Sequence, residues 1–202
     1  MQCVCKRKGE IMPRASAADA ARTAETVLTR ALELFGARGY AEVSLGDIAQ
    51  HAGVTRGAVY HHFRDKEGLF RAVVQRLQER VAETVVAAAE AAEADPRAQL
   101  RAGCHAFLDA VTDDVALRVL LVDAASVIGP HEWRRLDQEN SERHLREAIA
   151  AIGGDEELID AMTALLSGAM NEGAMWVALA DDRVAASARA HRALDALLST
   201  AA

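Results

Sequence analysis

Apolar side chains recur along most of the chain at the three- and four-residue spacing of an amphipathic helix. The first run is Leu28, Ala31, Leu32 and Phe35. Gly39 follows this run, and a glycine just beyond a helix can adopt the left-handed conformation that ends it. The pattern therefore predicts a first helix that finishes close to Gly39.

Two short helices with capping residues are predicted next. Ser44 precedes a helix over residues 45–52 that stops at Gly53, and Asp47 provides an acidic variant of the capping box. Thr55 caps the following helix, in which Val59 and Phe63 face inward. Only the short turn around Gly53 separates the two helices, so we expect them to pack closely.

Prolines, glycines and paired acidic residues divide the rest of the chain into six further helices. Asp95 is placed to cap a helix with Pro96 in its first position, and Gly129-Pro130 and Gly153-Gly154 end two others. The predicted helices cover residues 66–93, 96–111, 115–128, 131–152, 155–180 and 183–199. Nine helices and no convincing strand predict an all-α fold.

Composition supports a helical globular protein. Of the 202 residues, 44 are alanine, the strongest helix former, and only 4% are aromatic. Charges interrupt the apolar runs well before the length of a membrane-spanning helix, and no apolar segment follows the basic N-terminal cluster as it would in a secretory signal. Three cysteines cannot build a disulfide framework. We therefore expect a cytoplasmic protein without membrane association.

Charge is distributed unevenly. The net charge is −7, but residues 1–71 carry 11 Lys and Arg against 8 Asp and Glu, whereas residues 72–202 carry 12 against 22. Such an asymmetry is a weak indication that the first part binds nucleic acid and the second does not.

Residues 44–63 have the properties of a helix-turn-helix. Ala49 supplies the small residue where two helices cross, and Gly53 tolerates the tight turn. The residues that would lock the helices together are Ile48, Ala52, Val54 and Val59. The residues left on the outer face are Thr55, Arg56, Gly57, Tyr60 and His61, at the end of a helix that meets base edges in a major groove.

The same region resembles a known family. The segments LTRALELFGARGY, SLGDIAQHAGVT and RGAVYHHFRDKEGLF, within residues 22–72, are similar to the DNA-binding domain of the tetracycline-repressor (TetR) family. The stretch LLSGAMNEGAMWVALADD resembles the dimer-forming end of family members more weakly. The resemblance implies a homodimeric, ligand-responsive repressor with a nine-helix protomer that binds a palindromic double-stranded DNA operator.

The domain organisation expected from this resemblance has three parts. Residues 1–21 would form a basic, flexible tail, residues 22–72 the DNA-binding domain, and residues 73–202 a helical domain for effector binding and dimerisation. The basic residues 6–8 and Arg14 could follow DNA, although a solvated tail is the simpler interpretation. Met12 could also be an alternative start.

Roles at the DNA transfer position by position. The residues assigned to DNA are Ser44, Thr55, Arg56, Gly57, Tyr60, His61, His62 and Lys66. Arg56 is the candidate for bidentate reading of guanine, and Gly57 permits close approach. Lys66, at the head of the fourth helix, would add a phosphate contact. Gly46 departs from the family pattern, because many relatives carry a longer, often basic residue there.

The resemblance also implies an effector pocket and a dimer interface in the second half. The pocket candidates are Phe107, Val111, Leu121, Trp133, Leu136, Asn140, Leu166, Met170 and Trp176. Their mostly apolar character, with a few polar groups at Asn140, His144 and Glu172, predicts a small, largely hydrophobic, drug-sized effector. The dimer candidates are Gly168, Ala169, Gly173, Ala174, Ala186, Ala190, Leu194 and Leu197, which would build a four-helix bundle from two helices of each protomer.

Other functions have less support. No enzyme motif is present, so no catalytic residue and no cofactor are predicted. His105, Asp123 and His144 could converge on a metal, but surface or satisfied histidines are the more common outcome, and Cys3 with Cys5 is too little for a site. Cys104 is most simply a small buried apolar residue. Two alternatives stay open: a helical enzyme with a hidden site, and a DNA-binding module controlled by a protein partner or a metal.

Overall fold

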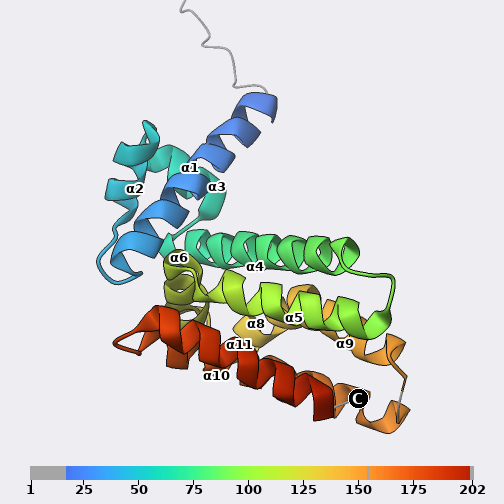
Figure 1. Ribbon diagram of the computed structural model, residues 1–202. Coiled ribbons are helices and arrows are strands. Elements are labelled where there is room, and N and C mark those ends of the chain that lie inside the picture. Colours follow the sequence, from blue (N-terminus) through green and yellow to red (C-terminus); the bar gives the residue numbers. More distant parts are fainter. Residues whose placement is uncertain (1–16, 154, 201–202) are drawn as a thin grey trace, which may run out of the picture.

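The computed structural model describes residues 17–153 and 155–200, and within them every regular element is a helix (Figure 1). The first five are α1 (Ala17–Arg38), α2 (Leu45–Ala52), α3 (Arg56–Phe63), α4 (Lys66–Ala91) and α5 (Pro96–Thr112). Then come α6 (Asp114–Ala116), η1 (Leu117–Asp123) and α7 (Ala124–Val127), followed by α8 (Pro130–Asp137), η2 (Gln138–Glu142) and α9 (Arg143–Ala151). The chain ends with η3 (Glu156–Leu158), α10 (Ile159–Ala178) and α11 (Arg183–Thr200).

The all-α prediction is confirmed. Because α6–η1–α7, α8–η2–α9 and η3–α10 each run on without a break, the described residues form nine continuous helical stretches. The predicted boundaries agree to within a few residues. The first helix, however, begins at Ala17, so residues 17–21, which were predicted to belong to the tail, are part of α1. The start of α1 is rich in alanine, and Asp19 lies in its first turn, where the helix dipole favours an acidic side chain. The basic residues 6–8, Arg14, Met12, Cys3 and Cys5 lie outside the described residues.

The caps of the short helices form as predicted. The Ser44 hydroxyl accepts a hydrogen bond from the Asp47 amide, and the Asp47 carboxylate accepts one from the Ser44 amide. Gly53 ends α2 with φ 66°, and the Thr55 hydroxyl caps α3 by accepting from the Ala58 amide. Local capping therefore sets the angle between α2 and α3.

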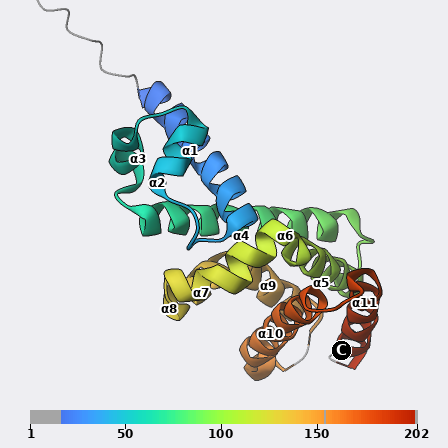
Figure 2. The same ribbon diagram turned by 90° about the vertical axis from the view of Figure 1, so that its left-hand side faces the viewer.

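Two groups of helices share one long element, α4 (Figures 1 and 2). Its first half packs beneath α1–α3, where Phe35, Tyr40 and Phe70 form a cluster of rings with centroids 4.9–5.8 Å apart. Its second half packs along α5, and α10 and α11 lie on the other side of α5. At ~1.5 Å per residue, the 26 residues of α4 extend ~39 Å from one group to the other.

Two π-helical turns interrupt the helices that follow α5. They occupy Leu117–Asp123 and Gln138–Glu142, inside runs that the sequence predicts as regular helices. A π-turn holds one residue more than an α-turn, so it rotates the side chains that follow it relative to an unbroken helix. Such turns are often found at functional sites.

A polar chain joins α11 to α5. Arg101 forms a bidentate salt bridge with Asp195, whose carboxylate also lies 2.7 Å from Nε2 of His105. Nδ1 of His105 lies 2.6 Å from Nδ1 of His191, and Nε2 of His191 lies 2.8 Å from Asp109. These contacts, with the buried Ala186 and Leu194, hold α11 against the protomer. Among the helices described, none is long and apolar enough to cross a membrane.

Candidate DNA-binding surface and effector cavity

The outer face of α3 is exposed where the sequence predicts DNA contacts. The exposed residues there are Thr55, Arg56, Gly57, Tyr60 and His61, whereas His62 is partly buried. Val59, on the opposite side, is fully buried and anchors α3 on α1 and α4. Ile48 and Ala49 of α2 are likewise buried. The inward and outward positions of the predicted helix-turn-helix are therefore separated as the pattern requires, and an exposed helix end of this kind can enter a major groove.

Two other residues assigned to DNA make contacts within the protein. The Ser44 hydroxyl donates a hydrogen bond to the Asp47 carboxylate at 2.6 Å. Together with the hydrogen bond from the Ser44 amide, it holds the pKa of Asp47 below its usual range. Lys66 Nζ lies 4.1 Å from the centre of the Tyr40 ring and 3.5 Å from the Ala41 carbonyl oxygen. Lys66 thus ties the start of α4 to the loop before α2, a role that the sequence did not indicate.

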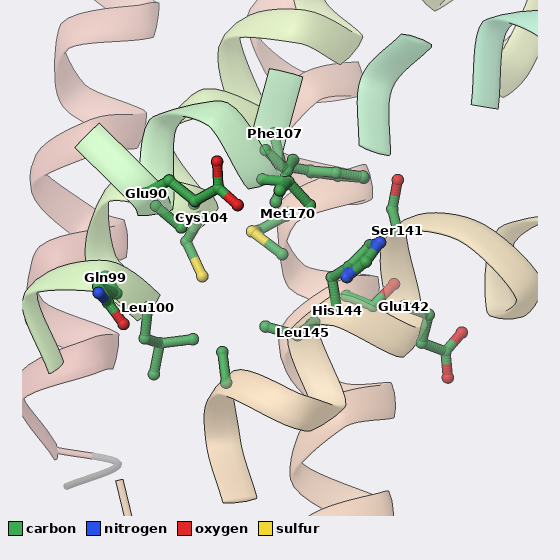
Figure 3. A pocket seen from close by; sticks show the side chains of 16 residues that line it. Glu90, Gln99, Leu100, Cys104, Phe107, Ser141, Glu142, His144, Leu145 and Met170 are labelled. Carbon is green, nitrogen blue, oxygen red and sulfur yellow. The ribbon is translucent and has the colours of Figure 1, made fainter. Parts of the chain in front are cut away.

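A cavity of about 180 Å³ lies between α4, α5, α9 and α10 (Figure 3). Phe107 and Met170, two of the nine pocket candidates, line it. His144, expected among the polar groups of the pocket, lines it as well. Sequence reasoning missed the other lining residues, which are Val85, Val86, Ala89, Glu90, Gln99, Leu100, Gly103, Cys104, Ser141, Glu142, Leu145, Ala148 and Ser167. Cys104 is buried, as expected, and burial raises the pKa of its thiol to about 12.

The structure places the other pocket candidates outside this cavity. Val111 and Leu136 are in the hydrophobic core, with Leu121, Trp133 and Leu166 packed at its edge. Asn140 lines a neighbouring groove, where its side chain donates to the Leu136 carbonyl. Trp176 is 47% exposed, under the guanidinium of Arg189. Ser141, the neighbour of Asn140 in η2, lines the cavity instead.

The dimer candidates divide between the inside and the outside of the protomer. Ala174, Ala186 and Leu194 are buried within it, so these three side chains have no surface to offer a partner and the prediction for them is corrected. Gly168, Ala169 and Leu197 are exposed, and Gly173 and Ala190 are partly buried. Near them on α10 and the following turn are Leu165, 74% exposed, and Leu179, 81% exposed. Large exposed apolar side chains such as these are often found at interfaces.

The histidines weighed as metal ligands do not converge. His105 pairs with His191 and Asp195, whereas Asp123 accepts a hydrogen bond from the Tyr40 amide and His144 faces the cavity. In residues 17–153 and 155–200 there is no group of three or more side chains arranged to hold a metal ion.

The geometry is that of a helix-turn-helix transcriptional regulator, and comparison with known proteins agrees. Residues 27–73 match the family model of the bacterial regulatory proteins of the tetR family, and residues 97–201 match that of the tetracyclin repressor-like C-terminal domain. The chain belongs to the TetR family. Its members are transcriptional regulators, not enzymes.

Individual relatives are similar over different lengths. The HTH-type transcriptional regulator AcrR of Shigella flexneri is 34% identical over 54% of this chain and 51% of its own length. The HTH-type transcriptional repressor BepR of Brucella suis is 44% identical over 31% of this chain and 30% of its own length. The matches thus span about half the length of these curated relatives or less. A TetR-family regulator from Pectobacterium atrosepticum is similar throughout, with 32% identity, a TM-score of 0.71, and coverage of 91% of this chain and 95% of that one.

Proposed function

We propose that this protein is a homodimeric repressor that binds a palindromic operator and releases it when a small molecule occupies the cavity beside α4. The observation that carries the proposal is the path of α4. Its first residue, Lys66, is one of the residues assigned to DNA, and Val85, Val86 and Ala89 near its end line the cavity. One rigid helix therefore contacts both the candidate DNA surface and the candidate effector site.

The exposed residues of α3 support the DNA-binding part. Thr55, Arg56 and Gly57 stand at the N-terminal end of the helix, where side chains can reach base edges. Tyr60, His61 and His62 follow further along α3, and Ser44 and Lys66 stand at the starts of α2 and α4. These side chains would contact phosphates, which position the protein without reading the sequence.

The exposed apolar surface of α10 and α11 supports the homodimer. Gly168 has no atom within 4 Å of where a Cβ would stand, so a second helix can approach closely there. A dimer must hold its two α3 helices one DNA turn, ~34–36 Å, or a multiple apart to enter successive major grooves. A ligand that pushes the end of α4 would alter this separation. If it favours the unsuitable spacing by ~1–3 kcal/mol, operator affinity falls ~5–150-fold.

The test is operator binding with and without candidate effectors. Fluorescence anisotropy would follow the dimer on palindromes from the region upstream of its own gene. Phe107→Ala should leave operator affinity unchanged and weaken the effector response, because Phe107 lines the cavity. Trp133→Ala is the matched control, since Trp133 lies outside the cavity. No binding to any palindrome, or equal effector responses in the two variants, would contradict the proposal.

A further inference from the structure

The turn between α1 and α2 is hydrogen-bonded to a helix in the second half of the chain. The backbone amide of Tyr40 donates to the carboxylate of Asp123 at 2.8 Å, across 83 residues of sequence. Asp123 is the last residue of η1, and both residues are partly buried. A hydrogen bond to a carboxylate is stronger than one between neutral groups, so this contact holds the turn firmly.

The end of α1 approaches the helices α6 and η1 closely. Gly39 has φ 81°, and the Arg118 guanidinium and the Asp123 carboxylate lie 3.3 and 3.5 Å from where its Cβ would stand. One turn earlier, a Cβ at Gly36 would overlap the side chain of Val115 in α6. Figures 1 and 2 both place α6 beside the C-terminal end of α1. Two glycines thus allow α1 to dock on α6 and η1.

The π-turn η1 presents two side chains to the same glycine. Arg118 and Asp123 are five residues apart, a spacing that an α-helix would turn through ~140° around its axis. In η1 the hydrogen bonds span five residues, as from the Ala124 amide to the Val119 carbonyl, so side chains five apart share a face. The turn also packs against α4, α5 and α10, three of the helices around the cavity. It therefore lies between the cavity helices and the α1–α2 turn.

Tyr40 links the position of this turn to residues assigned to DNA. Its ring packs against Phe35 and Phe70, and Lys66 Nζ lies 4.1 Å from the ring centre. Ser44, another residue assigned to DNA, caps α2 four residues after Tyr40. Fixing the Tyr40 backbone therefore helps to fix the starts of both α2 and α4.

We infer that Asp123 is a positioning residue for operator recognition, because it holds helices α1–α3 at a second point in addition to α4. A group of helices held only by α4 is free to pivot about it, whereas a group held at two points is not. In a dimer, the second point then fixes the separation and orientation of the two α3 helices, which select the spacing of the half-sites. This inference goes beyond the proposed function and rests on it only for the dimer and its palindrome.

Hydrogen exchange of the full chain without DNA tests the contact itself. In Asp123→Ala the Tyr40 amide loses its acceptor, so we expect the Tyr40 amide to exchange ~10-fold or more faster while α5 is unchanged. Asp123→Asn keeps an acceptor oxygen and should retain most of the protection. Asp114→Ala is the matched control, because it removes an exposed carboxylate of α6 that pairs with Arg183. Unchanged exchange in Asp123→Ala would overturn the inference.

Operator selection tests the consequence for DNA binding. Anisotropy would be measured on palindromes whose half-sites are moved together or apart by one and two base pairs. Each base pair changes the separation by ~3.4 Å and rotates one half-site against the other by ~35°. We expect the unaltered protein to prefer one spacing and Asp123→Ala to reduce that preference ~5-fold or more. Asp123→Asn and Asp114→Ala should keep the preference of the unaltered protein.

The dependence on spacing separates positioning from a general loss of stability. A less stable protein would bind more weakly at every spacing by the same factor, whereas a less firmly positioned α3 tolerates more spacings. An unchanged preference, or an equal loss of affinity at every spacing, in Asp123→Ala would overturn the positioning role. If the unaltered protein binds no palindrome at any spacing, the proposed function fails, and hydrogen exchange still decides whether Asp123 holds the turn.

Discussion

Individual side chains on α3 have different consequences for DNA binding. Arg56 follows the capping Thr55 directly, so its guanidinium extends from the exposed end of the helix. Arginine can donate two parallel hydrogen bonds to guanine, which makes it a base-reading side chain, not only a phosphate contact.

We therefore expect Arg56→Ala to weaken operator binding by ~1–3 kcal/mol and to relax the preference at one base pair of each half-site. Binding to a series of single-base operator variants would measure both effects. Arg97→Ala, which removes an exposed arginine at the start of α5, is the control and should bind as the unaltered protein does. Equal binding by both variants would show that Arg56 does not read a base.

A buried carboxyl group makes stability depend on pH. Asp137 is 4% exposed. Its burial and the nearby charge of Glu142 raise its pKa to about 6, although Arg134 and a hydrogen bond with Gln78 act in the opposite direction. The folded protein thus binds this proton more tightly than the unfolded chain. The protein therefore loses stability as the pH rises from about 4 to about 6, because the Asp137 carboxyl group ionises and its negative charge is buried in the folded protein.

Asp137→Asn removes that charge and keeps an amide able to bond with Gln78. We expect a gain of ~2–3 kcal/mol in the free energy of unfolding at about pH 8 and little change at about pH 4. Urea unfolding at both pH values would measure the difference. A gain of the same size at both would show that the ionisation of Asp137 is not the cause.

At the scale of helices, the junction between α3 and α4 depends on tight backbone packing. Arg64 has φ 68°, outside the usual region for a residue with a side chain, and the Asp65 carboxylate caps α4 by accepting from the Gly68 amide at 2.7 Å. A Cβ at Gly68 would overlap the carbonyl oxygen of Phe63. The backbone at the start of α4 is therefore tightly constrained, and α4 is the helix that would carry the effector signal.

Gly68→Ala should for this reason destabilise the protein by ~1–3 kcal/mol, even though alanine is the better helix former. Gly173→Ala is the control within a helix, because its nearest contact is the flexible Leu108 side chain at 4.0 Å. The control should be neutral or more stable by up to ~1 kcal/mol. Thermal unfolding of both variants measures the contrast, and a stable Gly68→Ala protein would contradict it.

At the scale of the whole molecule, most of the large exposed apolar side chains of the described residues lie on α10, α11 and the turn between them. Leu165, Trp176, Leu179, Val184 and Leu197 are all exposed on α10, α11 and the turn between them. Burying such side chains in a dimer would contribute ~25 cal/mol for each Å² of apolar surface removed from water. The surface thus offers a physical reason for the proposed homodimer.

Leu165→Glu should then convert the dimer into a monomer, because a carboxylate would be buried in the apolar interface. Light scattering coupled to size-exclusion chromatography would measure the mass, and operator affinity should fall with it. Val122→Glu, at a residue of similar nature that is 48% exposed on η1, should remain dimeric. A dimeric Leu165→Glu protein would move the interface away from α10.

Much of this protein could be derived from local sequence. Helix periodicity, the caps at Ser44, Thr55 and Asp95, and the left-handed turn at Gly53 depend on residues within one or two turns of each other. The outward positions of α3 follow from the same periodicity. For these reasons the prediction agrees with the nine helical stretches of residues 17–153 and 155–200 and with the exposed face of α3.

Contacts between distant helices were decided only by the tertiary structure. Ser141 lines the cavity and Asn140 does not, and the packing of α11 on α5 pairs His105 with His191 and buries Leu194. An amphipathic pattern specifies which face of a helix is apolar, but not whether that face meets the protein's own core, a cavity or a second protomer. That choice depends on how the helices pack together, because burial is a property of the assembled chain.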